Sequence, residues 1–394
     1  MSRNCSNLPL AGKKIAVLAS VESSFKNLFA NQLQAILQAG AELVAISTLE
    51  YPENLEFFYK MGIKFIPIEI KREISPFADL KTLVKLLRIL SREKVDLIHN
   101  QTPKPCLLGA LAGRILGIPV VNTTRPIFRE MPDSWRKRLF IFLEKISCRL
   151  SHLILVENPL DLDLYLELGI EKREKLRIQG NGIDLERFNP EKISSEEIEA
   201  LRKEISLPKD AQVVGCVARY VYEKGYKELF EAFDLLKDKY PKLWLLTVGF
   251  FLPSERDPIP RDLPEKMGIS QRVIMLENRS DMERIYALMD IFVLPTHRDC
   301  FPRSLIEASA MAKPIIATDI NGCRVVIEDR VSGILIPPKN SHLLAQAIEE
   351  LLENPLLAQK LGRNAREKSL RSFNEQEVCA RIISVYLDLL NLKS

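Results

Sequence analysis

Short apolar runs alternate with amphipathic segments along most of this chain. The first run, Ile15–Ala19, is continuously apolar, as in a strand that is buried on both faces of a parallel sheet. Between Phe25 and Leu37, apolar residues recur every three or four positions, which is the spacing of one helix face. Strand and helix patterns that alternate in this way predict an α/β protein built on parallel sheets.

The same pattern places the remaining elements. Apolar runs predict further strands at residues 43–47, 63–68, 95–99, 152–157, 213–218, 243–249, 272–276, 291–294 and 333–338. Helical spacing predicts helices at residues 80–90, 135–150, 281–289, 302–312 and 375–390. A charged, helical segment at residues 191–210 is expected to lead from one half of the chain into the other.

The stretch from Pro295 to Pro338 carries the most chemical information. It begins where the apolar strand 291–294 ends, with a polar loop and then a helix that starts near a proline. Asp299 is expected in the loop and Glu307 at least one turn into the helix. The first amides of this helix, at Arg303 and Ser304, are suited to an anion. Because ligands of open α/β sheets bind at the carboxyl ends of strands, the stretch predicts a ligand site.

Length and composition limit the possible classes. A chain of 394 residues exceeds one hydrophobic core, so two domains are expected. Its apolar fraction of 46% and charged fraction of 27% are those of a soluble enzyme, and a net charge of +4 is too small to indicate nucleic acid.

Cysteine usage and hydropathy indicate where the protein works. Seven scattered cysteines without metal-ligand spacing indicate reduced thiols in the cytoplasm. The polar start of the chain predicts no signal peptide, and no apolar run approaches the ~20 residues of a spanning helix. We therefore expect a cytoplasmic protein that can contact a membrane only peripherally, at its inner face.

The stretch from Asp299 to Glu307 resembles the signature of the family 4 retaining glycosyltransferases. In that family an acidic residue is followed after seven residues by Glu, an Ala-rich helix and a strand like Pro314–Thr318. Asp stands here where the family usually has Glu, and Cys300 where it often has Gly. The resemblance implies the GT-B fold, an α/β architecture with two Rossmann-like domains facing across a cleft.

The resemblance also implies a domain plan. Residues 1–189 would form an acceptor-binding domain and residues 190–372 a nucleotide-sugar-binding domain. Residues 373–394 would form a helix that returns to the first domain.

Two cations of the second half match the family's Arg-x-x-x-x-Lys-Gly element, at Arg219 and Lys224. The resemblance implies that they hold the donor diphosphate, that Asp299 contacts the donor sugar and that Glu307 contacts the ribose. Other readings are a pair of surface cations, an Asp299 that merely caps the helix and a Glu307 that pairs with a nearby arginine. The remaining donor-binding residues expected from the resemblance are Gly249, Cys300, Phe301, Arg303 and Ser304.

In the first half, a His-x-x-Thr-Pro-Lys run contains His99 and Lys104. It is similar to members of the family that act on polyprenyl-diphosphate-linked sugars, which implies contacts with the acceptor. His99 can equally be a histidine held at a strand end by backbone hydrogen bonds, and Lys104 can be a solvated lysine.

The family usually has a histidine in the next loop, but this chain has Arg125 and Arg129 instead. A guanidinium cannot act as a base, but it can bind a diphosphate through two parallel hydrogen bonds. The tight turn expected at Asn181-Gly182 would place Gly182 beside the cleft.

Two further segments were weighed for membrane and metal binding. The segment Trp135–Leu150 is basic and strongly apolar, which suits an anionic membrane surface, where each basic residue contributes about 1 kcal/mol. It can also pack its apolar face on the sheet and leave the basic end in solvent. The Asp161-Leu162-Asp163 sequence lies inside a predicted helix, so we expect no metal site there.

These observations predict a retaining, metal-independent glycosyltransferase without a cofactor. We expect it to move a sugar from a nucleotide sugar, with UDP as the expected nucleotide, to a glycan or lipid-linked acceptor in cell-surface polysaccharide or glycolipid synthesis. One alternative is a non-catalytic relative that serves as a binding or partner subunit, favoured by the absent histidine and the Ser-rich loop after the first strand. Another is a UDP-sugar 2-epimerase, which needs carboxylates and a histidine facing the sugar. A nicotinamide dehydrogenase is disfavoured because that loop lacks GxGxxG.

Overall fold

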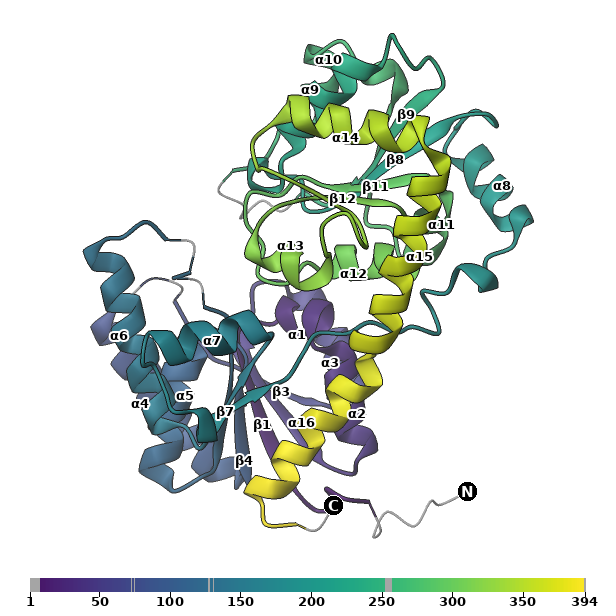
Figure 1. The fold of residues 1–394 in the computed structure, drawn as a ribbon. Coiled ribbons are helices and arrows are strands. Elements are labelled where there is room, and N and C mark those ends of the chain that lie inside the picture. Colours follow the sequence, from purple (N-terminus) through teal and green to yellow (C-terminus); the bar gives the residue numbers. More distant parts are fainter. Residues whose placement is uncertain are drawn as a thin grey trace, which may run out of the picture. The chain divides into compact units, whose positions relative to one another are not determined.

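The computed structural model describes residues 8–392 except 72, 74, 127, 130 and 252–256. The chain divides into two compact units, Met1–Gly180 with Gln376–Ser394, and Asn181–Glu375. Each unit contains one parallel sheet with helices on both faces (Figure 1). The predicted α/β class with two domains is therefore confirmed.

The sheet of the first unit has the strand order β3-β2-β1-β4-β5-β6-β7, and every pairing is parallel. The strands are β1 (Lys14–Val21), β2 (Glu42–Thr48), β3 (Lys64–Pro67), β4 (Leu97–Asn100), β5 (Val120–Thr124), β6 (Leu153–Val156) and β7 (Leu176–Ile178). The helices are α1 (Ser23–Leu28), α2 (Ala30–Gln38), α3 (Leu55–Met61), α4 (Pro76–Glu93), α5 (Pro103–Leu116), α6 (Trp135–Leu150), α7 (Pro159–Glu167) and, from the end of the chain, α16 (Glu375–Leu389).

Alternate residues of β1 supply two separate cores in the first unit. Ile15 and Val17 pack toward α1, α2, α3 and α16, whereas Ala16 and Leu18 pack toward α4 and α5. The helices α4, α5 and α6 lie on one side of this sheet and α2 and α16 on the other (Figure 1). Buried apolar residues of α16, among them Ile382, belong to the first core, so the last helix returns to the first unit as predicted.

The sheet of the second unit has the order β10-β9-β8-β11-β12-β13, again parallel throughout. Its strands are β8 (Gln212–Val217), β9 (Leu243–Gly249), β10 (Val273–Glu277), β11 (Ile291–Leu294), β12 (Ile315–Thr318) and β13 (Ile334–Ile336). Its helices are α8 (Ser195–Glu204), α9 (Tyr226–Leu236), α10 (Leu263–Lys266), α11 (Met282–Leu288), α12 (Arg303–Ala310), α13 (Asn321–Val326), α14 (Ser341–Glu353) and α15 (Pro355–Ser372). Strand order reverses between β8 and β11, which is the point where open α/β sheets bind ligands.

The segment between Phe25 and Leu37 was predicted as one helix, and the structure breaks it at Phe29 into α1 and α2. Phe29 leaves the helical conformation, with φ −120° and ψ 1°. Its buried ring meets the ring of Phe25 edge-on, at 6.2 Å between centroids, and its centroid lies 5.5 Å from Cζ of the distant Arg125, so tertiary packing contributes to the break. No proline or glycine marks this position, and the apolar spacing therefore could not predict it.

Two glycine turns also differ from the predictions. The left-handed residue near Asn181 is Gly180, with φ +81°, and Gly182 has no positive φ. Gly182 is needed for another reason, because a Cβ atom there would lie 2.7 Å from the amide nitrogen of Glu375. At Asn321-Gly322, a second Asn-Gly pair of the kind that is typical of turns, the helix α13 begins instead.

Candidate functional site

The loop after β8 carries the two predicted donor cations. Arg219, which is partly exposed, lies two residues after the end of the strand, and a 3-10 turn (Tyr222–Lys224) leads into α9. Gly225 joins this turn to the helix with φ +77°. A Cβ atom on Gly225 would penetrate the carbonyl oxygen of Pro295, so only glycine lets the two loops approach this closely.

Lys224 and Asp299 form an ion pair in the second unit. Their Nζ and Oδ2 atoms are 2.6 Å apart, and Nζ also donates to the carbonyl of Arg298 at 3.3 Å. The side chains are 11% and 23% exposed, so the pair is shielded but still reachable from solvent. The alternative in which Asp299 caps α12 is not seen, because the N-cap is Pro302 without a side-chain cap bond. The fold thus brings Lys224, the predicted contact of the diphosphate, next to Asp299, the predicted contact of the donor sugar, at the carboxyl edge of the sheet.

The loop before Asp299 is fixed by contacts with the loop and helix that follow β8. The amide of His297 donates to the carbonyl of Glu223 at 2.8 Å, and the guanidinium of Arg298 pairs with the Glu223 carboxylate at 2.8 Å. His297 Nε2 lies 3.0 Å from Glu228 Oε1. These ties hold the backbone around Asp299, and they could not be inferred from the two separate motifs.

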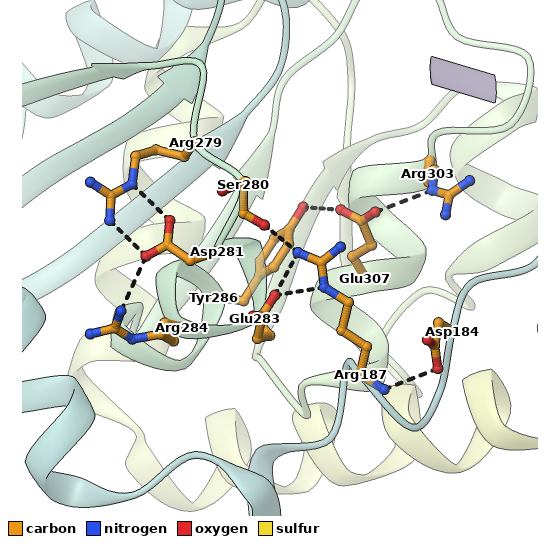
Figure 2. A network of polar contacts seen from close by, with 10 residues as sticks. All are labelled: Asp184, Arg187, Arg279, Ser280, Asp281, Glu283, Arg284, Tyr286, Arg303 and Glu307. Atoms are coloured by element: carbon orange, nitrogen blue, oxygen red, sulfur yellow. Dashed lines mark hydrogen bonds and ion pairs between the residues drawn. The ribbon is translucent and has the colours of Figure 1, made fainter. Parts of the chain in front are cut away.

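Glu307 lies in α12, whose first turn contains Arg303 and Ser304. Its side chain is 13% exposed and accepts hydrogen bonds from Tyr286 Oη at 2.8 Å and from Arg303 Nε at 3.2 Å (Figure 2). Burial raises the pKa of the Glu307 carboxyl, and the charge of Arg303 opposes that rise. The pairing with arginine that the sequence left open is therefore present. A carboxylate offers about four acceptor sites, so these two bonds leave capacity for a ligand.

The other predicted donor residues have structural contacts as well. Gly249 ends β9 where a Cβ atom would penetrate the carbonyl oxygen of Ala218, so a neighbouring strand end already requires this glycine. Phe301 is 7% exposed and packs edge-on against Phe373, with the ring centroids 5.8 Å apart. Cys300 is partly exposed beside Asp299. Donor contacts of these three residues stay predictions.

His99, a predicted acceptor contact, has no exposed surface. Its Nε2 is 2.7 Å from Thr123 Oγ1, and its Nδ1 is 2.5 Å from Tyr386 Oη. Thr123 Oγ1 already donates to Gln179 at 2.9 Å, so we infer that His99 Nε2 donates to Thr123 and that Nδ1 accepts from Tyr386. Burial lowers the pKa of His99 to about 3. This setting argues against contact with an acceptor.

A neutral His99 makes the stability of the protein pH-dependent. As the pH falls below 6.5, unfolded chains bind a proton that the folded chain binds only near pH 3. The contribution of neutral His99 to the free energy of unfolding is therefore present at neutral pH and is lost as the pH falls from about 6.5 to 3. We expect the stability difference between wild type and His99→Gln to shrink as the pH falls, by up to about 1.4 kcal/mol per pH unit.

Urea unfolding of both proteins at pH 7, 6, 5 and 4 measures this effect. His342→Gln, which changes an exposed histidine of α14, is the control for loss of a histidine. A difference between wild type and His99→Gln that stays constant across these pH values would contradict the expectation.

The three predicted acceptor cations are all paired with carboxylates inside the first unit. The ion pairs are Lys104 with Asp79 at 2.7 Å, Arg125 with Glu157 at 2.7 Å and Arg129 with Asp161 at 2.9 Å. Burial raises the pKa of Asp161 to about 7. A phosphate would have to compete with these carboxylates, so phosphate binding by these cations stays a prediction.

Metal binding was considered for the Asp161-Leu162-Asp163 sequence. Asp161 lies in the first turn of α7, where Asn158 Oδ1 accepts from its amide at 2.9 Å. Within the part of the chain that the structure describes, no group of three or more His, Cys, Asp or Glu side chains is placed to hold a metal ion.

Glu22, which sequence reasoning missed, organises the loops at the carboxyl edge of the first sheet. Its side chain has no exposed surface and lies in the Ser-rich loop after β1. It accepts hydrogen bonds from the amides of Glu50 at 2.8 Å and Tyr51 at 3.1 Å, and from Asn54 Nδ2 at 3.0 Å. One acidic residue among serines gave no pattern from which this role could be predicted.

Two family models match consecutive parts of the chain. The model described as Glycosyltransferase Family 4 matches residues 27–187, and the model described as Glycosyl transferases group 1 matches residues 197–368. Together they span most of both units. The second match includes the loop of Arg219 and Lys224 and the stretch from Asp299 to Glu307.

Individual relatives agree with these models. The capsular polysaccharide biosynthesis glycosyltransferase CapM of Staphylococcus aureus is 28% identical over 81% of this chain and 83% of its own. The N,N'-diacetylbacillosaminyl-diphospho-undecaprenol alpha-1,3-N-acetylgalactosaminyltransferase of Campylobacter jejuni is 29% identical over 86% of this chain and 88% of its own.

Among solved structures, Anabaena HepE in complex with UDP and glucose superimposes with a TM-score of 0.80 at 20% identity, covering 95% of this chain and 100% of its own. At this identity the likeness shows the fold, and it agrees with the two parallel-sheet units seen here.

Proposed function

Because this chain belongs to the family 4 glycosyltransferases and has their GT-B fold, we propose that it transfers a sugar from a UDP-sugar to a lipid-linked acceptor with retention of the anomeric configuration. One observation carries the proposal: the second unit brings the Lys224–Asp299 ion pair and Glu307 to the carboxyl edge of its sheet, from two separate segments of the sequence. A cation for the diphosphate and acceptor groups for sugar and ribose are the chemistry that a nucleotide sugar needs.

The nucleotide and the acceptor are assigned from different observations. HepE, which shares the fold, was crystallised with UDP and glucose, and this supports a UDP-sugar as the donor. The Campylobacter jejuni relative is named for a diphospho-undecaprenol acceptor, which supports a sugar linked to a polyprenyl diphosphate. The cations Lys104, Arg125 and Arg129 in the first unit suit the diphosphate of such an acceptor.

In the proposed reaction, the bond between the anomeric carbon and the β-phosphate oxygen breaks and UDP leaves. The acceptor hydroxyl bonds to the same face of that carbon, and its proton passes to the leaving phosphate. Lys224 and Arg219 stabilise the charge that develops on the diphosphate, so the cations come from the protein and no metal ion is required. Asp299 binds hydroxyls of the donor sugar, and Glu307 accepts hydrogen bonds from the ribose.

The proposal is tested with the purified protein, a panel of UDP-, GDP- and ADP-sugars and a membrane lipid extract. Release of UDP from one UDP-sugar, increased by the lipid, is the expected result, and NMR of the product then reports the anomeric configuration. Release from a GDP- or ADP-sugar alone would overturn the assignment of the nucleotide. Nucleotide binding without release from any donor would favour the non-catalytic relative.

We also propose that the first unit rests on an anionic membrane through α4 and α6. Large apolar side chains are exposed on both helices: Phe77 (91%) and Leu80 (60%) on α4, and Trp135 (70%) and Phe142 (59%) on α6. Exposed cations accompany them on the same helices, at Lys81, Lys85, Arg88, Arg136 and Arg138. Aromatic and basic side chains exposed on the same helix are typical of helices that lie in a membrane interface.

The remaining structure is consistent with such a location. Both helices pack against α5 on one side of the first sheet (Figure 1). None of the helices in the described part of the chain is both long and apolar enough to cross a bilayer. Contact at the cytoplasmic face of the membrane would bring the protein to a lipid-linked acceptor.

A double variant with serine in place of both Phe77 and Trp135 is expected to bind vesicles of phosphatidylglycerol and phosphatidylcholine roughly tenfold more weakly. Each substitution removes an aromatic ring that would be buried in the membrane interface. Co-sedimentation with the vesicles measures the change. Tyr59→Ser removes a ring that is 87% exposed on α3, which packs on the other face of the sheet, and serves as the control. Equal binding by wild type and both variants would reject the proposed surface.

A further inference from the structure

We propose that Arg187 is a positioning residue of the donor site, which fixes the loop Asn278–Asp281 and the start of α11 and, together with Arg303, gives Glu307 its positive surroundings. Arg187 belongs to the segment that opens the second unit, far from both site motifs in sequence. The proposal rests on the proposed function, because it takes Glu307 as the residue that binds the ribose.

The backbone of Arg187 is held by a local turn. Asp184 Oδ1 accepts from the amides of Glu186 and Arg187, each at 3.0 Å (Figure 2 shows the second bond). The amide of Phe188 donates to the carbonyl of Asp184 at 2.9 Å. The side chain of Arg187 therefore leaves a turn whose direction is already determined.

The guanidinium of Arg187 contacts three groups. Nε donates to Glu283 Oε2 at 2.7 Å, and Nη2 donates to the carbonyl oxygen of Ser280 (Figure 2). Its Cζ atom lies 5.1 Å from the ring centroid of Phe188. One side chain thus ties the loop before α11 to the first turn of that helix.

The loop Asn278–Asp281 is also held by contacts that do not involve Arg187. Arg279 donates to both carboxylate oxygens of Asp281, at 2.8 and 2.6 Å, and Arg284 Nη1 lies 3.6 Å from Asp281 Oδ2. Asn278 adopts a left-handed conformation, with φ +55°. These contacts use no atom of Arg187, so its bond to Ser280 adds an independent anchor.

A short chain of contacts links Arg187 to Glu307. The ring of Phe188 lies 6.0 Å from the buried ring of Tyr286, whose hydroxyl donates to Glu307 at 2.8 Å. Burial raises the pKa of Glu307, and the charges of Arg303 and Arg187 both act to lower it. Figure 2 draws the contacts of Arg187 with Glu283 and Ser280 together with the hydrogen bond between Tyr286 and Glu307.

Two arginine charges and one neutral donor act on the Glu307 carboxyl: Arg303 from its own helix, Arg187 from the opening segment and the Tyr286 hydroxyl from α11. Both arginines are shared with other carboxylates. Arg303 Nη2 lies 3.7 Å from Glu375, and Arg187 is bonded to Glu283. Because the charge of each arginine lowers the pKa of Glu307, loss of either is expected to move the protonation of Glu307 to a higher pH.

The ionisation of Glu307 decides how it can bind a ribose. A carboxylate accepts hydrogen bonds from both hydroxyls of the diol, whereas a protonated carboxyl must use one oxygen as a donor. UDP is therefore expected to bind less tightly as the pH falls through the titration of Glu307. Removing a nearby positive charge should bring this weakening to a higher pH.

The test compares Arg187→Met, which removes the charge, with Arg187→Lys, which keeps it. The dissociation constant of UDP is measured by calorimetry from pH 5 to 8, and the Glu307 carboxyl is titrated in the free protein by carbon NMR, assigned with Glu307→Gln. We expect both midpoints to move to a higher pH in Arg187→Met. In Arg187→Lys the midpoints should return to those of wild type. Arg284→Met removes a neighbouring arginine of the same network as a matched control.

The two measurements separate this inference from the proposed function. An unchanged Glu307 midpoint in Arg187→Met would overturn the role of Arg187, whatever happens to UDP. A raised Glu307 midpoint with UDP binding that is unaffected by Glu307→Gln would support the role of Arg187 and reject Glu307 as the ribose contact. Identical behaviour of Arg187→Met and Arg284→Met would also overturn the inference, because it would show a general structural effect.

Discussion

Replacing Lys224 with methionine is expected to lower the rate of sugar transfer by about 10²–10³-fold while the protein stays folded. Methionine keeps most of the length of the side chain but removes the charge that the proposed mechanism places on the donor diphosphate. It also leaves Asp299, 2.6 Å away in the wild type, without its partner. Initial rates with saturating acceptor measure the loss, and circular dichroism checks the fold.

Lys227→Met is the matched control, because Lys227 lies three residues further on in α9 and its side chain is 62% exposed. It forms an ion pair with Glu231, at 3.8 Å. We expect this variant to transfer at nearly the wild-type rate. Equal rates for Lys224→Met and Lys227→Met would show that Lys224 has no role in the mechanism. The main support for the donor site would then be lost.

Replacing Gly225 with alanine is expected to destabilise the second unit by about 3 kcal/mol or more. A left-handed conformation costs an alanine about 1–2 kcal/mol, and at φ +77° Gly225 needs that conformation. The added Cβ atom also meets the carbonyl oxygen of Pro295, which is backbone and cannot rotate away. The loops that carry Lys224 and Asp299 must then move apart, so UDP binding should be lost together with stability.

Chemical unfolding and UDP titration of Gly225→Ala check both effects. Gly268→Ala provides the comparison, since Gly268 has φ +68° but nothing lies within 4 Å of its Cβ position. It should cost about 1 kcal/mol and leave UDP binding intact. If the two alanine variants are equally stable, the close approach of the loops at Gly225 has no energetic importance.

The two alternatives to a catalytic transferase require different residues in the site. A non-catalytic relative has no need of an intact Lys224–Asp299 pair, yet the structure retains it. A 2-epimerase needs a histidine facing the sugar. His99 is buried in the first unit, and His297 is hydrogen-bonded to Glu228. Both arrangements favour the transferase.

Much of the fold could be predicted from local patterns. The strands at Leu243–Gly249 and Ile291–Leu294 and the helix at Trp135–Leu150 have the predicted bounds, because continuous apolar runs and three- to four-residue spacing are local signals. The helix break at Phe29 and the start of α13 at Asn321 were not predicted. Both depend on what the surrounding structure packs against the segment, which no local pattern reports.

For the candidate site, the motifs identified which residues to examine, but their partners came from the fold. Spacing placed Asp299 in a loop and Glu307 in a helix, and the structure agrees. It could not show that Asp299 pairs with Lys224. It also could not show that burial makes His99 a neutral residue of the core.

The sequence by itself determined the class of fold, the order of most strands and helices, and the family, because each depends on patterns within a few dozen residues. Only the tertiary structure decided which charges are paired, which polar groups are buried and which glycines are indispensable. Those properties depend on atoms that come within a few ångströms after folding, from segments as distant along the chain as Arg187 and Glu283. Electrostatic energies depend on these short distances and on the exclusion of water, so the chemistry of the site is a property of the folded protein.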